Sequence, residues 1–270
     1  MLDRTPLSRL ALLEELYRDF NDRRHVAPDP LTPVLTQADP ADREVTALVA
    51  AALAFGKASG IEAAAADALG RFPAPAADLA RLNQRAIEAR CKGFQYRYVK
   101  TAELAGLLWG VREVRRAHGS LEAAFLAGFN GGRDGPLAGV GHLADRLRAA
   151  SDRACGYLVP DPAKGSACKR LHLFLRWMVR RDAVDPGGWT GVTPAQLIVP
   201  LDTHMLRIAQ TLGLTRRRSG GLATALEVTR AFARWAPGDP VRYDFALTRL
   251  GIQRLERGGR FLEAWRALPE

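Results

Sequence analysis

The sequence predicts an all-α protein, and three observations support this prediction. Apolar residues recur at steps of three and four along most of the chain, the spacing that places them on one face of a helix. No segment sustains the alternation of apolar and polar residues that is typical of a half-buried strand. The chain has 270 residues, 47% of them hydrophobic, so it can bury a substantial core without disulfides or metals.

The N-terminal part of the chain contains three predicted helices. The first apolar pattern covers residues 7–20 and indicates an amphipathic helix. Four prolines lie in residues 28–40, so we expect a connector there and no helix. An Ala-rich stretch, residues 42–69, is interrupted at Gly56, which predicts two helices with a tight joint.

Further helical patterns are separated by Gly, Pro or Asn residues. They cover residues 77–90, 101–117, 120–129 and 138–155, and a last group runs from 194 to 266. Segment 168–181 differs because it is apolar on nearly every side, as in a helix at the centre of a globule. Lys169 lies at the start of this segment.

The charge of the chain predicts a polyanionic partner. The formal net charge is +10, and clustered cations gain free energy by releasing the counterions condensed on phosphates. A basic, well-solvated surface is the alternative. Only a few of the 39 cationic residues are lysines, which unlike arginine can be deprotonated by their surroundings. These lysines are Lys57, Lys92, Lys100, Lys164 and Lys169.

Cysteine usage and hydropathy point to an intracellular protein. The three cysteines are Cys91, Cys155 and Cys168, and they form no C-x-x-C pair, so neither a disulfide framework nor a zinc site is indicated. The N-terminus has no signal-peptide pattern, and the longest apolar run, residues 47–55, is too short to cross a bilayer. We therefore expect a cytoplasmic protein that does not associate with membranes.

Lys169 is the first candidate for a reactive residue. A partly desolvated lysine at the positive end of a helix would favour the neutral amine, which is the nucleophilic form. The preceding Gly165 and Ser166 are expected to offer free backbone N–H groups to a phosphate. The alternative is an ordinary exposed residue in the first helical turn.

Asp202 is the second candidate, and it directly precedes an apolar helical pattern that ends at Gly213. Asp is a preferred N-cap residue because its carboxylate accepts hydrogen bonds from the first free N–H groups of the helix. A capping carboxylate is held in place and stays ionised, and its second oxygen can face a cleft. The structural and the catalytic interpretation of Asp202 are therefore compatible.

The residues around Asp202 carry a resemblance to a known superfamily. They read Pro200-Leu201-Asp202-Thr203-His204, followed by Arg207-Ile208-Ala209 and by Leu212-Gly213-Leu214. This segment resembles the one that bears the catalytic aspartate in the helix-hairpin-helix DNA glycosylases, the superfamily of endonuclease III. In bifunctional members a lysine starts the second hairpin helix, and Lys169 occupies that place. The spacing of the two residues is closer to that of the archaeal 8-oxoguanine glycosylases.

The chain also resembles an uncharacterised bacterial family, and the two resemblances together cover most of residues 42–255. The segments that carry this second resemblance are residues 93–98, 169–180 and 243–247. The superfamily implies two helical lobes with a DNA-binding cleft between them. One lobe, residues 42–198, is a helical barrel with a degenerate hairpin, and the N- and C-terminal segments, residues 1–41 and 199–270, form the other.

The resemblance implies a bifunctional DNA glycosylase and AP lyase that acts as a monomer on double-stranded DNA. The damaged nucleotide is flipped out of the duplex, Lys169 attacks its anomeric carbon to form a Schiff base, and Asp202 supports the positive charge that develops on the sugar. An oxidised base such as 8-oxoguanine is the expected substrate. Two rivals stay open: a non-catalytic DNA-binding module of the same fold, and a monofunctional glycosylase for alkylated or deaminated bases.

Supporting roles fall to further residues. Those expected at the base pocket are Lys57, Asp244, Trp189 and His204, and those expected at DNA phosphates are Gly165, Ser166, Arg170, Arg207, Arg216 and Arg217. Each also has a plain structural interpretation: a solvated lysine or arginine, a core tryptophan, a locally hydrogen-bonded histidine.

Two departures from the superfamily shape the remaining expectations. Residues 160–166 lack the Leu-Pro-Gly-Val-Gly hairpin sequence. The four clustered C-terminal cysteines that bind the iron-sulfur cluster of endonuclease III are absent, because all three cysteines lie before residue 169. We therefore expect neither an iron-sulfur cluster nor any other metal or cofactor.

Overall fold

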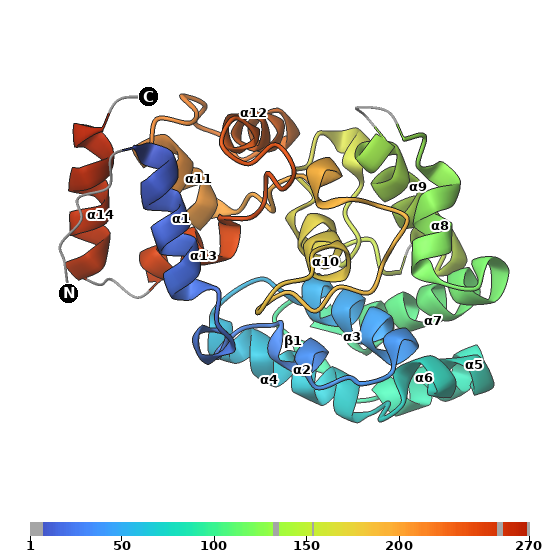
Figure 1. Ribbon diagram of the computed structural model, residues 1–270. Coiled ribbons are helices and arrows are strands. Elements are labelled where there is room, and N and C mark those ends of the chain that lie inside the picture. Colours follow the sequence, from blue (N-terminus) through green and yellow to red (C-terminus); the bar gives the residue numbers. More distant parts are fainter. Residues whose placement is uncertain (1–7, 132–134, 153, 253–255, 269–270) are drawn as a thin grey trace.

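The computed structural model describes residues 8–131, 135–152, 154–252 and 256–268. Within them the chain forms fourteen α-helices, three short 3-10 helices and one two-stranded hairpin (Figure 1). The predicted all-α class is confirmed. Residues 7, 153 and 253–255 of the predicted helices, and the two ends of the predicted second lobe, lie outside the described part.

The elements follow one another along the chain in this order. The first half holds α1 (Arg9–Phe20), η1 (Arg23–His25), α2 (Thr32–Leu35), α3 (Pro40–Ala52), α4 (Ala58–Gly70), α5 (Pro75–Arg81), α6 (Gln84–Cys91), β1 (Gln95–Tyr96), β2 (Val99–Lys100), α7 (Thr101–His118) and α8 (Leu121–Gly128). The second half holds α9 (Gly135–Ala150), η2 (Pro162–Lys164), α10 (Lys169–Val179), η3 (Pro194–Gln196), α11 (Thr203–Thr211), α12 (Leu222–Ala233), α13 (Asp244–Ile252) and α14 (Glu256–Ala267).

At two places the predicted boundaries are wrong for a clear local reason. The expected connector contains the four-residue helix α2, whose Pro33 occupies one of the first two helical positions, where the missing N–H breaks no hydrogen bond. The expected helix over residues 77–90 is split into α5 and α6. Asn83 causes the break, because its side chain accepts the N–H of Ala86 and caps α6.

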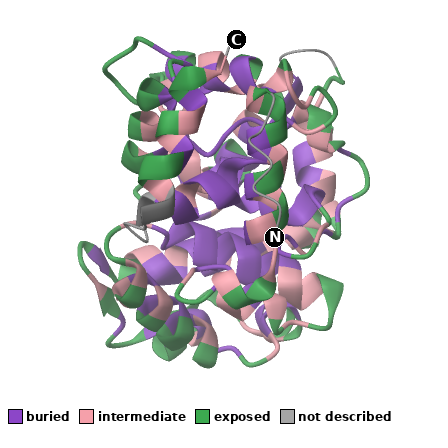
Figure 2. Cartoon of the chain, turned by 60° about the vertical axis from the view of Figure 1, so that its left-hand side comes forward, coloured by how far each residue is buried: buried purple, intermediate pink, exposed green. Residues whose placement is uncertain are grey.

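Helix α10 lies in the centre of the molecule and packs against α3 (Figure 1). Residues 171–179 are all buried, as its uniformly apolar sequence predicts, and the buried residues gather in the middle of the fold (Figure 2). Nearly all of α3 from Glu44 to Ala52 is buried as well. The two helices therefore form a rigid base for the residues at their ends.

The two ends of the chain pack together. Helix α1 lies against α13 and α14 (Figure 1). Glu14 accepts hydrogen bonds from Arg242, at 2.9 and 3.1 Å, and from the hydroxyl of Tyr243 at 2.6 Å. The cation of Arg242 also lies 4.0 Å from the ring centre of Tyr17. The N-terminal segment thus joins the C-terminal helices, while the exact partition into two lobes stays a prediction.

Glu44 ties α3 to its surroundings. Its buried carboxylate accepts the backbone N–H groups of Leu121 and Glu122 at the start of α8, each at 3.0 Å. It also accepts the indole N–H of Trp189 at 3.0 Å and pairs with Arg115 at 3.2 Å. One side chain on α3 therefore satisfies donors from three other parts of the fold.

Replacing Glu44 with Ala is expected to lower the free energy of unfolding by about 3–5 kcal/mol, because it leaves several buried donors and a mostly buried arginine without their acceptor. Chemical denaturation of the two proteins measures the difference. The matched control is Glu15→Ala on the exposed face of α1, which should change the value by less than about 0.5 kcal/mol. An equally small effect of Glu44→Ala would contradict this role.

Candidate active site

Lys169 and Asp202 meet at the point where α10 and α11 begin. The ammonium nitrogen of Lys169 lies 3.3 Å from Oδ2 of Asp202. Lys169 is the first residue of α10, and Asp202 is the N-cap of α11. Their side chains are 30% and 27% exposed, respectively, so the pair is held by the fold and still open to solvent.

The two oxygens of Asp202 have different partners. Oδ1 accepts the backbone N–H of Met205 at 2.8 Å, which is the capping hydrogen bond that the sequence predicts. The backbone oxygen of Asp202 accepts the first helical bond from Leu206 at 2.8 Å. The cap therefore fixes the orientation of the carboxylate and leaves Oδ2 to face Lys169.

Lys169 has a second anchor, which the sequence did not indicate. Its ammonium donates to the backbone oxygen of Ala54 at 3.4 Å, and the neighbouring Arg170 donates to that of Ala52 at 3.1 Å. Both acceptors lie at or just beyond the C-terminal end of α3, where carbonyl groups lack helical partners and the helix dipole is negative. The end of α3 thus holds the lysine toward Asp202.

The turn after Ala54 requires a glycine. Gly56 has a φ of +106°, and a Cβ atom there would lie 2.8 Å from the hydroxyl of Tyr96 and from the guanidinium of Arg97. The hydroxyl of Tyr96 also donates to the backbone oxygen of Phe55 at 2.5 Å. The loop that supplies the acceptor for Lys169 is therefore packed against the hairpin of β1 and β2.

A buried network of charges lies behind the pair. Arg176 pairs with Asp244 at 2.6 Å and with Asp185 at 2.9 Å, and all three side chains are almost inaccessible. Arg180 pairs with Asp185, with Asp182 at 2.8 Å and with Asp239 at 2.9 Å. The network connects α10 to the loop that follows it and to the start of α13. It was not among the sites predicted from the sequence.

Asp244 belongs to this network and not to an open pocket. Burial raises the pKa of Asp244 to about 6. The positive charge of Arg176 lowers this pKa, and the negative charge of Asp202 raises it further. Its Oδ1 is buried without a hydrogen-bond partner in the described residues. The prediction that Asp244 contacts a DNA base is wrong for this structure, because the carboxylate is enclosed and paired.

Trp189, which was predicted to stack on a DNA base, is buried in the core instead. It is 6% exposed, its indole N–H donates to Glu44, and Phe174 meets it edge to face with ring centres 5.2 Å apart. A polar, Gly-rich loop can still bury an aromatic ring when the acceptor comes from a distant helix. Trp189 therefore stabilises the core.

Lys57 is the exposed N-cap residue of α4 and follows Ala54 by three positions in the sequence. It does not cap the helix through its side chain, and its place at the base pocket stays a prediction.

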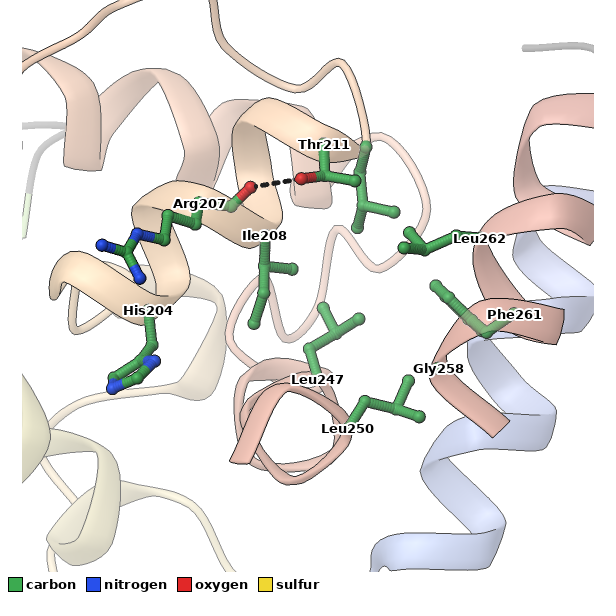
Figure 3. A pocket seen from close by; sticks show the side chains of 10 residues that line it. His204, Arg207, Ile208, Thr211, Leu247, Leu250, Gly258, Phe261 and Leu262 are labelled. Carbon is green, nitrogen blue, oxygen red and sulfur yellow. Dashed lines mark hydrogen bonds between the residues drawn. The ribbon is translucent and has the colours of Figure 1, made fainter. Parts of the chain in front are cut away.

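His204 and Arg207 are exposed on α11 and line a mostly apolar cavity of about 370 Å³ between α11, α13 and α14 (Figure 3). Ile208, Leu247 and Leu262 surround this cavity, whereas Lys169 and Asp202 are not among its lining residues.

The predicted phosphate-binding hairpin is only partly suited to that role. The N–H of Gly165 is not free, because it donates to the backbone oxygen of Pro162 at 3.1 Å, and the prediction for Gly165 is wrong. The hydroxyl of Ser166 accepts the N–H of Cys168 at 3.1 Å. The N–H of Ser166 has no backbone acceptor within the described residues, so it can still serve an anion.

The arginines predicted to contact phosphates differ in their exposure and in the partners they already have. Arg170 donates to the backbone oxygens of Ala52 and Tyr157, and burial lowers the pKa of its guanidinium, so the side chain is held against the protein and its phosphate contact stays a prediction. Arg207 and Arg216 are exposed. Arg217, in the loop between α11 and α12, is exposed too and pairs with Glu227 on α12 at 2.6 Å.

Comparison with known proteins places the chain in one family. Residues 29–253 match a family model described as "Protein of unknown function (DUF2400)". The chain belongs to this family. The matched DUF2400 region contains both Lys169 and Asp202, together with the ends of α3, α10 and α11 that hold them. No curated protein and no solved structure matches the chain.

Two further findings concern metals and membranes. In the part of the chain that the structure describes, no group of three or more His, Cys, Asp or Glu side chains could hold a metal ion. Cys91, Cys155 and Cys168 are buried and unpaired. Among the described helices, none combines the length and the apolar character needed to cross a bilayer.

Proposed function

We propose that this chain is a bifunctional DNA glycosylase that removes an oxidised base and then cleaves the strand. The contact that supports the proposal is the 3.3 Å approach of the Lys169 ammonium to Oδ2 of Asp202. The two residues come from different helices, each is fixed by a second hydrogen bond, and both remain partly exposed. A nucleophile beside a group that can accept its proton is the arrangement that covalent catalysis requires.

The reaction follows from this pair. The sugar of a damaged nucleotide can reach Lys169 only when the nucleotide is flipped out of the duplex. A proton passes from the ammonium to Oδ2 of Asp202, and the neutral amine attacks the anomeric carbon. The new carbon–nitrogen bond replaces the bond to the base, and the base departs with that electron pair and takes the proton that Asp202 has accepted.

The covalent intermediate then leads to strand cleavage. The sugar ring opens, its ring oxygen takes up a proton, and the nitrogen of Lys169 is left doubly bonded to the anomeric carbon as a Schiff base. Loss of a proton from the adjacent carbon breaks the bond to the 3′-phosphate, and water finally releases the enzyme. Asp202 can carry the proton through these steps because it adjoins the nitrogen throughout.

The charge of the chain supports DNA as the partner. The net charge is +10, which favours a polyanionic partner. Exposed cations follow the site residues closely in the sequence: Lys57 comes three positions after Ala54, and Arg207 five positions after Asp202. The proposal includes a monomer with two helical lobes and a DNA-binding cleft between them, with the pair in the cleft. We propose 8-oxoguanine as the first substrate to test.

A second candidate is a DNA-binding module without chemistry. The Lys169 ammonium already has two acceptors, Oδ2 of Asp202 and the backbone oxygen of Ala54, which is also how a purely structural ion pair is satisfied. In that case the chain binds damaged DNA and releases no base.

Borohydride trapping distinguishes these functions. The protein is incubated with duplexes that contain 8-oxoguanine, an oxidised pyrimidine, an alkylated base, uracil, an abasic site or no damage, and borohydride reduces any Schiff base to a stable adduct. We expect adducts with at least one oxidised base and with the abasic site, and none with the undamaged duplex. The absence of any adduct would overturn the lyase, and base release without an adduct would indicate a monofunctional glycosylase.

A further inference from the structure

An exposed group of aromatic side chains lies next to Lys169, and we call it the aromatic patch. Its members are Phe55, Tyr96, Tyr98 and Tyr157. Tyr157 stands edge to face against both Phe55, with ring centres 5.3 Å apart, and Tyr98, at 6.3 Å. Tyr98 and Tyr157 are 70% and 48% exposed, respectively, and they are two of the three exposed large hydrophobic side chains in the described residues.

The hairpin that carries Tyr98 is firmly anchored. Its strands β1 and β2 pair Gln95 with Lys100 and Tyr96 with Val99. Val99 is fully buried, and the hydroxyl of Tyr96 is bound to the backbone of Phe55. Tyr98 lies in the turn between the two strands. The hairpin therefore holds it in a fixed position, although its ring is not part of the core. The exposed ring of Tyr98 is therefore accessible to a partner.

The patch is linked to the candidate active site by direct contacts. Ala54, which accepts a hydrogen bond from the Lys169 ammonium, is followed at once by Phe55. Arg170, the neighbour of Lys169, lies over the rings of Phe55 and Tyr157 at 5.4 and 5.2 Å. A duplex that places a sugar at Lys169 would therefore have the base pair of that sugar, including the base on the opposite strand, close to the patch.

The charge around the patch matches a nucleic acid. The guanidinium of Arg97 lies 5.8 Å from the ring centre of Tyr98, and the exposed Lys57 follows Phe55 by two positions. Exposed aromatic faces next to cations are typical of surfaces where bases stack and phosphates bind. A lipid surface would instead call for a broader apolar area, because the two exposed tyrosines of the patch bury little in a bilayer.

We propose that Tyr98, supported by Tyr157, stacks on an unpaired base of the bound DNA, namely the base left without a partner when the opposite nucleotide is flipped toward Lys169. This inference rests on the proposed function only in that DNA occupies the Lys169 site. Arg97 then contacts a nearby phosphate. The patch reads the presence of an unpaired base and not its identity, since every base has an aromatic face.

Photocrosslinking tests this placement directly. A duplex carries 5-iodouracil opposite a tetrahydrofuran abasic analogue, which cannot form a Schiff base, and irradiation joins iodouracil to an aromatic ring stacked on it. We expect a crosslink that mass spectrometry maps to Tyr98. A duplex with the iodouracil paired, one helical turn away, should give no crosslink at Tyr98. A crosslink that maps elsewhere, or none, would overturn the proposal.

Affinity measurements with the same analogue give a second test. Tyr98→Ala is expected to raise the Kd for the tetrahydrofuran duplex roughly 5- to 100-fold, while Tyr98→Phe, which keeps the ring, should stay close to the unaltered protein. The Kd for a fully paired duplex should change less than about twofold, because that duplex has no unpaired base. Leu10→Ala, at the exposed leucine of α1, is the control for a general loss of apolar surface.

Equal weakening of the paired and the tetrahydrofuran duplex by Tyr98→Ala would show a nonspecific DNA contact and overturn the stacking role. The two proposals can fail separately. A protein that never forms a borohydride adduct but crosslinks at Tyr98 would refute the chemistry and keep the stacking site. A protein that forms the adduct without a Tyr98 crosslink would do the reverse.

Discussion

Lys169→Gln is expected to abolish the borohydride adduct and to slow base removal by on the order of 10³-fold or more, because an amide cannot form a Schiff base. The measurement is single-turnover base release together with adduct formation on the lesion found by trapping. Glutamine is polar and only one atom shorter than lysine, and the position is partly exposed, so the fold should survive. Thermal unfolding of the variant verifies this.

Two further variants separate the nucleophile from a cation that merely holds DNA. Lys169→Arg keeps the positive charge but places there a group that stays protonated, so DNA binding should persist while the adduct and base release are lost. Lys164→Gln, at an exposed lysine of η2 shortly before the site, should leave the adduct intact. Base release that survives Lys169→Arg would contradict the nucleophilic role.

The features that the sequence predicted correctly depend on local patterns. The burial of α10 follows from apolar residues on nearly all its sides, and the cap at Asp202 follows from the preference of aspartate for that position. The meeting of Lys169 and Asp202 was an expectation of the resemblance, and the structure places the two side chains together. Their reactivity remains a prediction.

The features that the sequence did not reveal depend on contacts between distant segments. Ala54 holds Lys169 through a backbone oxygen, which carries no residue-specific signal, and Trp189 is buried because Glu44 supplies an acceptor from far along the chain. One signal was available. Arg176 and Arg180 lie in or next to a helix that is otherwise apolar, and a buried guanidinium requires carboxylate partners.

Asp202→Asn is expected to lower the rate of base removal by about 10²- to 10⁴-fold while leaving the fold intact. Asparagine caps a helix about as well as aspartate, so the hydrogen bond from Met205 is retained. The neutral amide at the position of Oδ2, however, can neither take the proton of Lys169 nor stabilise the positive charge on the sugar. Asp202→Ala should show the same loss and, in addition, about 1 kcal/mol less stability from the missing cap.

The pH dependence of stability provides an independent check on Asp202. The pKa of Asp244 is raised from an ordinary value of 3.8 to about 6, mainly by burial and to a smaller extent by the charge of Asp202. The native state therefore keeps a proton that the unfolded chain releases, so this group makes stability fall as the pH rises from 3.8 to about 6. Removing the charge in Asp202→Asn should lower the pKa of Asp244, and stability should then decrease less over this pH range. Denaturation of both proteins across this pH range measures it, and an unchanged profile would mean that the two carboxylates do not interact.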